Sequence, residues 1–268
     1  MLGKASWWVA GTAGALVLAP PAFAQLGAPT QSAPPEGIMQ GSGAASPQGH
    51  YAALDSLPDW GGVWFVTAGG FEASAGRAEP KLKGEFRTRR EQWVAEVRAN
   101  NGLERRTDSN CSPPGMPRIM RLSQYPSEFI FSPGRVTINQ EAWMQTRTIW
   151  TDGRKHKVDP DPTFMGDSIG HWEGETLVVE TRGISDTLQM DTGVPHSDKF
   201  VVFERISLDP ADPNVLIDEM RMEDPDALLE PFEVTTRYRR DRHGALLEFQ
   251  CAQNDRNPVN EHGETEYR

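Results

Sequence analysis

The sequence predicts a mainly β protein, an antiparallel β-barrel or β-sandwich that carries one amphipathic helix. From residue 128 onward, short runs rich in β-branched and aromatic residues alternate with turn signals such as Pro133-Gly134 and His243-Gly244. Many short strands joined by tight turns are typical of antiparallel barrels and sandwiches. After a first strand that begins within 59–64, the expected strands are 128–132, 135–139, 142–150, 168–173, 175–182, 199–208, 215–223, 233–240 and 245–252.

One segment, residues 78–100, has the pattern of an amphipathic helix. Phe86, Trp93, Val94 and Val97 recur at helical spacing, and basic side chains fill the opposite face. The run 100–102, Asn-Asn-Gly, supplies a C-terminal stop. We therefore expect this helix to pack against the barrel or sheet.

The expected strand 199–208 has polar and apolar side chains on both of its faces. Phe200, Val202, Glu204 and Ile206 share one face, whereas Val201, Phe203 and Arg205 share the other. Neither face is purely apolar, so the pattern does not have the clean alternation of a sheet with one dry side. A barrel with a partly polar interior would need such faces, and so would a sheet that loops cover on one side.

The N-terminal residues 1–24 have the features of a secretory signal peptide. Lys4 precedes an apolar run that is too short to span a membrane, and Ala22-Phe23-Ala24 forms a cleavage site. We expect cleavage after Ala24 and a periplasmic or secreted protein without stable membrane insertion. Residues 25–56 are expected to be a disordered leader, 57–256 a single β domain, and 257–268 a flexible tail.

Charge narrows the class of partner. Without Lys4, 26 basic residues stand against 38 acidic ones, a net charge of −12. Such a surface disfavours nucleic acid and anionic membranes, which leaves a small molecule as the expected partner. The oligomeric state is open. In an oxidising compartment, the two cysteines, Cys111 and Cys251, are expected to form a disulfide.

Two resemblances follow from short motifs. Gly62-Val63-Trp64 resembles the G-x-W opening of lipocalin-like barrels. The chain also resembles a widespread family of secreted bacterial proteins with no established activity, through the stretches 111–118 (CSPPGMPR), 151–156 (TDGRKH) and 166–180 (GDSIGHWEGETLVVE) and the pair Glu204-Arg205. The first resemblance implies a lipocalin-like barrel, and the second implies a grouping without a mechanism.

The stretch 166–181 predicts a β-hairpin whose two-residue loop is Glu173-Gly174. His171 and Glu173 should then share one face of the strand, and Asp167 could fold back toward His171. A histidine beside a carboxylate can transfer protons near neutral pH, so His171 is a candidate acid or base with Asp167 or Glu173 as its orienting partner. The alternative is a purely structural hydrogen bond between strands.

Two further histidines, His156 and His196, lie on expected loops. Together with His171 and the candidate anion-binding residue Arg154, they could converge at one mouth of a barrel. The alternative for each of them is a structural role.

Several residues are candidate ligand-binding groups inside the barrel. A buried Arg147, or a buried member of Glu204-Arg205, needs a charged partner from the protein or from a ligand. Five tryptophans of the expected β domain could line an apolar pocket or simply belong to the core. These five are Trp60, Trp64, Trp143, Trp150 and Trp172.

Other chemistries have little support in the sequence. The chain has no cysteine cluster or closely spaced histidine pair for a metal, no nucleophile elbow, and no nucleotide-binding glycine loop, so we expect no metal and no cofactor. Two functions remain. The first is a cofactor-independent lyase, isomerase or decarboxylase that acts on a small aromatic or hydrophobic molecule. The alternative is a non-catalytic carrier or sensor of similar ligands.

Overall fold

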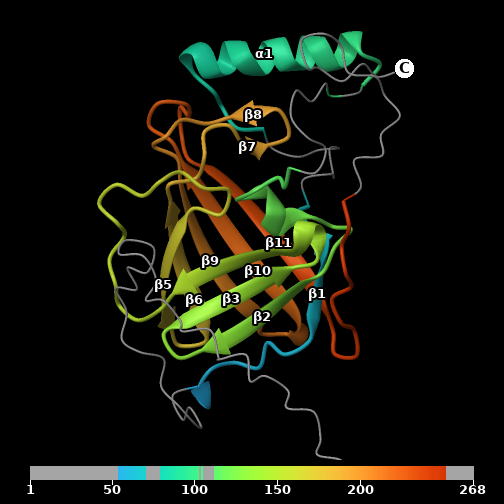
Figure 1. Ribbon diagram of the computed structural model, residues 1–268, viewed down its shortest axis with the longest axis vertical. Coiled ribbons are helices and arrows are strands. Elements are labelled where there is room, and N and C mark those ends of the chain that lie inside the picture. The colour runs from blue at the N-terminus through green and yellow to red at the C-terminus, as the bar shows by residue number, and fades with distance from the viewer. Residues whose placement is uncertain (1–53, 71–78, 103, 105–111, 252–268) are drawn as a thin grey trace, which may run out of the picture. The chain divides into compact units, whose positions relative to one another are not determined.

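The computed structural model describes residues 54–70, 79–102, 104 and 112–251, all within the compact unit Gly43–Arg268 (Figure 1). The expected signal peptide, its cleavage site after Ala24, most of the leader and the 257–268 tail lie outside the described residues. Cys111 also lies outside them, so its disulfide with Cys251 stays a prediction.

Nine strands form a closed barrel, which confirms the predicted fold class. In spatial order they are β1, β11, β10, β9, β6, β5, β4, β3 and β2. All neighbours are antiparallel except β4 and β5. The strands are β1 Val63–Ala68, β2 Ser127–Ser132, β3 Arg135–Gln140, β4 Gln145–Trp150, β5 Asp167–Glu173, β6 Thr176–Arg182, β9 Val201–Asp209, β10 Asp212–Glu223 and β11 Phe232–Asp241.

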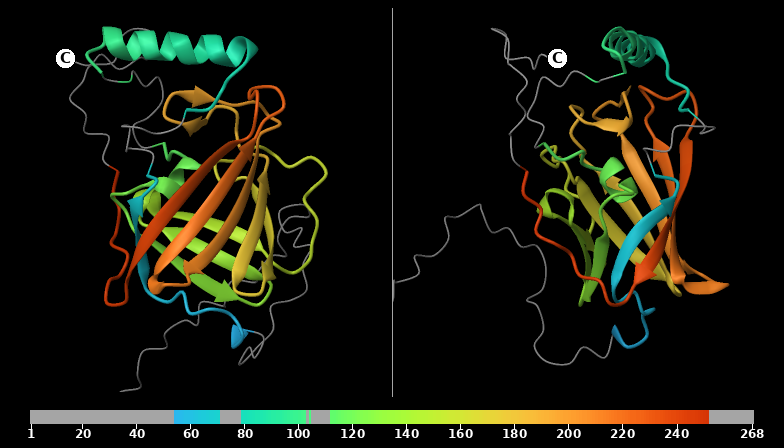
Figure 2. Two further views of the ribbon diagram at one scale, coloured as in Figure 1. Left: turned by 180° about the vertical axis from the view of Figure 1, so that it is seen from behind. Right: turned by 90° about the vertical axis from the view of Figure 1, so that its right-hand side faces the viewer.

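The first barrel strand closes the structure. β1 pairs with β11 along most of its length and with β2 through only two residue pairs, Val63 with Glu128 and Trp64 with Ser127. The right-hand view in Figure 2 shows β1, in blue, between the green strands and the red β11. The barrel is therefore joined through strands from opposite ends of its sequence.

The helix α1, Gly84–Ala99, begins later than predicted. Gly84 has a φ of +54°, a left-handed conformation that interrupts regular helix, and residues 79–83 before it are not helical. A two-stranded sheet of β7, Gln189–Asp191, and β8, Val194–Pro195, lies against α1. A Cβ atom at Gly193 would lie 2.3 Å from the ring of Trp93, so only glycine permits this close approach.

Three predictions about strands need correction. The segment 142–150 starts with the 3₁₀ turn η3, Ala142–Met144, because Trp143 and Met144 have positive φ angles of 53° and 51°. The described residues of 245–252 contain no strand. The β5–β6 loop is Gly174-Glu175, one residue beyond the expected loop, which puts Gly174 with its φ of +62° at the first central position that a type II′ turn reserves for glycine.

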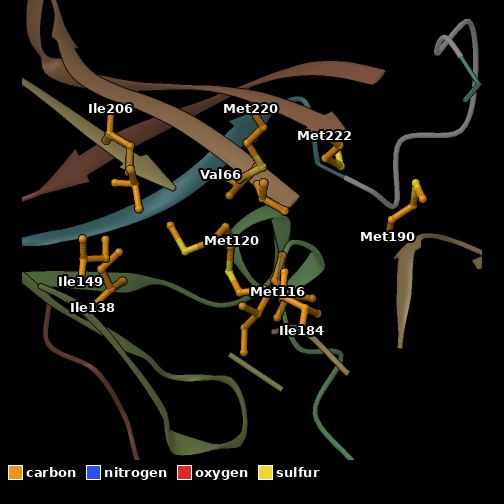
Figure 3. Close-up of a cluster of buried hydrophobic side chains, with 14 of the residues drawn as sticks. Val66, Met116, Met120, Ile138, Ile149, Ile184, Met190, Ile206, Met220 and Met222 are labelled. Atoms are coloured by element: carbon orange, nitrogen blue, oxygen red, sulfur yellow. The ribbon is translucent and has the colours of Figure 1, made fainter. Parts of the chain in front are cut away.

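The barrel interior is filled by side chains from every strand. Near the β5–β6 turn, Trp60 packs edge-on against Phe129, Phe131 and Trp172 at centroid distances of 5.3–5.4 Å. Elsewhere in the core, methionines from η2 (Arg118–Arg121), its preceding loop and β10 come together with isoleucines of the strands (Figure 3). Met116, Met120, Met220 and Met222 belong to these segments, and the fifth labelled methionine, Met190, is on the short strand at Gln189–Asp191.

The segment η2 is fastened to the inner face of the barrel. The hydroxyl of Tyr238 on β11 donates to the carbonyl of Met120, and the side-chain amide of Gln140 on β3 lies 3.5 Å from the Met120 sulfur. Arg121 is fully buried and its Nη1 donates to Asp191 over 3.1 Å. These contacts fix η2 over the polar interior described below.

Candidate functional site

His171 lies on the outer surface of the barrel. Its side chain is 64% exposed, and its Nε2 is 3.2 Å from Oε1 of Glu173. Glu173 also accepts a 2.9 Å hydrogen bond from Arg205 on β9, and this bond, followed by that of His171, lowers the pKa of Glu173. His171 and Glu173 therefore share a face as predicted, but that face is a solvated ion-pair cluster rather than the barrel interior.

Asp167 pairs with His156 and not with His171. Its Oδ2 is 2.9 Å from Nδ1 of His156 and also accepts from the backbone N–H of Lys157. Nε2 of His156 lies 3.5 Å from Oε1 of Glu180 on β6. The parallel pairing of β4 with β5 leaves a crossover connection between the two strands, and that connection carries His156 back to the first residue of β5.

A surface depression opens beside His156. Its lining is mixed in charge. It includes the basic side chains of Lys157, Arg182 and Lys199 and the acidic side chains of Asp186 and Asp198. A second depression shares Asp186 and Asp198 and has His196 in its lining. The structure thus places two of the three predicted histidines in adjoining depressions and leaves His171 out.

His196 is fully buried, and its imidazole is held in one orientation. Nδ1 donates to the carbonyl of Ser197 over 2.8 Å, and the ring lies 4.4 Å from that of Phe200. Nε2 has no hydrogen-bond partner among the described residues. Burial lowers the pKa of His196, so the imidazole is neutral near pH 7.

Arg147 lies inside the barrel, where it has protein partners for its charge. Nη1 donates to Glu204 over 2.8 Å, Nη2 donates to Glu204 and to Thr181, and Nε donates to Ser168. Burial alone would lower the pKa of Arg147, but the charge and hydrogen bonds of Glu204 raise it. The buried arginine and Glu204 are therefore a cross-strand ion pair, and Arg205 points outward to Glu173.

Two buried residues beside this ion pair are absent from the sequence-based candidates. Asp218 on β10 and Thr236 on β11 are both 0% exposed, and their side-chain oxygens have no hydrogen-bond partner in the described part of the chain. Burial, followed by the charge of Glu204, raises the pKa of Asp218 well above its ordinary value. The alternation of residue types along the strand could have indicated that Asp218 is buried, because Asp218 lies on the same face of β10 as Leu216, Met220 and Met222.

The remaining candidates do not gather around one ligand site. Arg154 is bound to Asp152 and lies 3.6 Å above the ring of Trp150. Trp143 packs with Tyr125 and Phe249, apart from the Trp60–Trp172 cluster. Trp64 is fully buried, and its indole N–H donates to the carbonyl of Trp60.

Among the described residues, no three side chains of His, Cys, Asp or Glu come together in a way that could hold a metal ion. No helix in that part of the chain is both long and apolar enough to cross a membrane. The chain matches no model of a known protein family, and it matches no curated protein.

Proposed function

We propose that the protein is a cofactor-independent acid–base enzyme whose proton-transferring group is His156, in the depression beside β6. The observation that carries the proposal is the 2.9 Å contact between Nδ1 of His156 and the carboxylate of Asp167. A carboxylate only accepts, so it fixes the Nδ1–H tautomer and leaves Nε2 as the basic nitrogen. That nitrogen is buried, lies 3.5 Å from Oε1 of Glu180 and has no hydrogen-bond partner among the described residues. The expected signal peptide would place this activity in the periplasm.

The lining of the depression suggests the kind of substrate. Arg182 and Lys199 line it, and both are about half exposed, in ion pairs with Glu180 and Asp226. Exposed ion pairs contribute little stability, so a substrate carboxylate can replace one partner at small cost. Val158, Pro160 and Pro162 supply apolar surface. A small aromatic acid with a proton next to a carbonyl group fits these features.

The test uses phenylpyruvate in D₂O, with loss of its methylene proton signal followed by NMR. Wild-type protein should accelerate the exchange over buffer, and His156→Gln should lose about 10²-fold to 10⁴-fold of that rate, the usual contribution of general acid–base catalysis. His171→Gln, a change of the same kind on the exposed face, is the matched control and should retain the rate.

A carrier would give a different pattern. It would bind phenylpyruvate in calorimetry without accelerating the exchange, and His156→Gln would change only the affinity. An acceleration that survives in His156→Gln would instead show that His156 is not the proton-transferring group.

A further inference from the structure

The depression that His196 lines is formed by the first turn of α1, the β6–β7 loop, the β8–β9 loop and the β10–β11 loop. Its volume is about 670 Å³, within the range of small-molecule sites. Hydrogen bonds hold its walls together. The backbone N–H of Lys83 donates to the carbonyl of Ala227 over 3.0 Å, and the carboxylate of Asp224 accepts from the N–H and the hydroxyl of Ser197, each over 2.7 Å. The start of α1 and the β8–β9 loop are therefore both fastened to the β10–β11 loop.

His196 contributes an acceptor that the protein leaves unpaired. The residue is 0% exposed, and its Nε2 has no hydrogen-bond partner in the part of the chain that the structure describes. Because Nδ1 donates to the carbonyl of Ser197, Nε2 carries the lone pair of the neutral imidazole and only accepts. A buried acceptor without a partner is costly, so the missing partner is a donor that a ligand can supply.

Two carboxylates of the lining favour a positively charged donor. Asp186 and Asp198 line the depression, and neither carboxylate forms an ion pair with a described side chain, whereas Asp226 is paired with Lys199 over 2.6 Å. Burial lowers the pKa of His196, and the charge of Asp186 partly opposes this effect, which places Asp186 within electrostatic range of the imidazole. An ammonium group can donate to Nε2 and neutralise Asp186 at the same time.

The first turn of α1 offers donors for a negative group. This helix begins without a side-chain cap, and the backbone N–H groups of Gly84, Glu85 and Phe86 have no acceptor among the described residues. Such a helix N-terminus attracts anions. Glu85 is the acidic side chain of this turn, and Arg89, four residues later and also in the lining, offsets its charge. A carboxylate can therefore bind beside these N–H groups.

We propose that this depression binds a free α-amino acid, recognised by its ammonium and carboxylate groups. The ammonium donates to Nε2 of His196 and to Asp186, and the carboxylate accepts from the first-turn N–H groups of α1 and faces Arg89. An α-amino acid carries both charges on one carbon atom, which matches a site with acceptors on one wall and donors on another. The two depressions share Asp186 and Asp198, but His156 lines only the other one.

The test compares L-leucine with N-acetyl-L-leucine, which lacks the ammonium group, and with L-leucinamide, which lacks the carboxylate. Binding is followed at neutral pH through the ¹⁵N signal of Nε2 in protein with labelled histidine, assigned with His196→Phe. L-leucine should shift this signal, because Nε2 gains a donor, and should leave the signals of the exposed His171 unchanged. It should bind at least about tenfold more tightly than either analogue, because each analogue lacks a charged hydrogen-bonding group.

Variants separate the two halves of the site. Asp186→Asn should remove most of the preference over N-acetyl-L-leucine, and Arg89→Gln should reduce the preference over L-leucinamide. Both changes are at exposed side chains, so the folded state should persist. Arg87→Gln is the matched control, because Arg87 is exposed on the same helix, lies 4.0 Å from Glu91 and is not in the lining. His156→Gln should also leave the affinity for L-leucine unchanged.

Three results would each overturn the proposal. The first is an Nε2 signal that L-leucine leaves unshifted, as expected if water alone fills the depression. The second is equal binding of L-leucine and its two analogues. The third is an affinity for L-leucine in Asp186→Asn and Arg89→Gln that equals the affinity in Arg87→Gln.

Discussion

Arg147 and Glu204 are joined across the interior of the barrel by two hydrogen bonds, from Nη1 to Oε1 over 2.8 Å and from Nη2 to Oε2. Arg147 is on β4 and Glu204 on β9, and β5 and β6 lie between these strands in the sheet. This ion pair therefore connects two strands that are not neighbours in the sheet, across the interior of the barrel.

Removal of one partner should show how much the buried ion pair of Arg147 and Glu204 matters for stability. Arg147→Met leaves the carboxylate of Glu204 buried and unpaired, which should lower the free energy of unfolding by about 3–5 kcal/mol. Arg205→Met, in the exposed ion pair with Glu173, should cost about 0–1 kcal/mol. Urea denaturation measures both values. Equal losses would show that the buried pair has no special importance.

Asp218→Asn should stabilise the protein, and more so as the pH rises. The pKa of Asp218 is raised above 3.8 in the folded state, so above about pH 4 the folded protein binds more protons at this group than the unfolded chain. Wild-type stability therefore falls as the pH increases from there toward the folded pKa, whereas the asparagine variant does not titrate. Urea denaturation between pH 4 and 8 tests this, and a stability difference independent of pH would contradict it.

The pKa shift of His196 should make folding stability depend on pH in the opposite direction. Its pKa is lowered below 6.5 in the folded state, so the unfolded chain binds more protons there as the pH falls below about 6.5. Wild-type protein should lose stability from that pH down toward the folded pKa. His196→Phe should remove this loss at the constant cost of the hydrogen bond to Ser197. Parallel pH profiles for His196→Phe and wild type would refute the assignment.

Tyr238→Phe should loosen η2. The change removes the donor to the carbonyl of Met120, at a cost of about 1–3 kcal/mol for a buried carbonyl left unpaired. Amide hydrogen exchange within Arg118–Arg121 should become faster, because this bond fastens η2 to β11. Tyr125→Phe is the matched control and should leave the exchange of η2 unchanged. Similar exchange in both variants would mean that other contacts hold η2.

Alternation was enough to predict much of this fold. It predicted that His171 and Glu173 share a face, and the same two-residue period distinguishes Glu204 from Arg205. It did not predict η3, because Trp143 is a residue type common in strands and the positive φ angles of Trp143 and Met144 arise from the local turn. The two short strands β7 and β8, three and two residues long, have too few residues to show a period.

The candidate site was less predictable. The partner of Asp167 depends on the parallel pairing of β4 with β5, which is a property of the topology and not of the local sequence. Asp218 has a similar explanation. A carboxylate within a strand is ordinarily assigned to the solvated face, and only its apolar neighbours on alternate positions indicate that it points inward.

The two-sided pairing of β1 has a consequence for folding kinetics. Val63 pairs with Asp241, so the contact that closes the barrel joins the earliest and latest strands of its sequence. Such long-range pairing carries a large loop-closure entropy and slows folding. During synthesis β1 cannot form its hydrogen bonds with β11 until β11 has been synthesised. Until then the free edges of β1, β2 and the C-terminal strands are templates for intermolecular pairing, and the chain is most prone to aggregate in that interval.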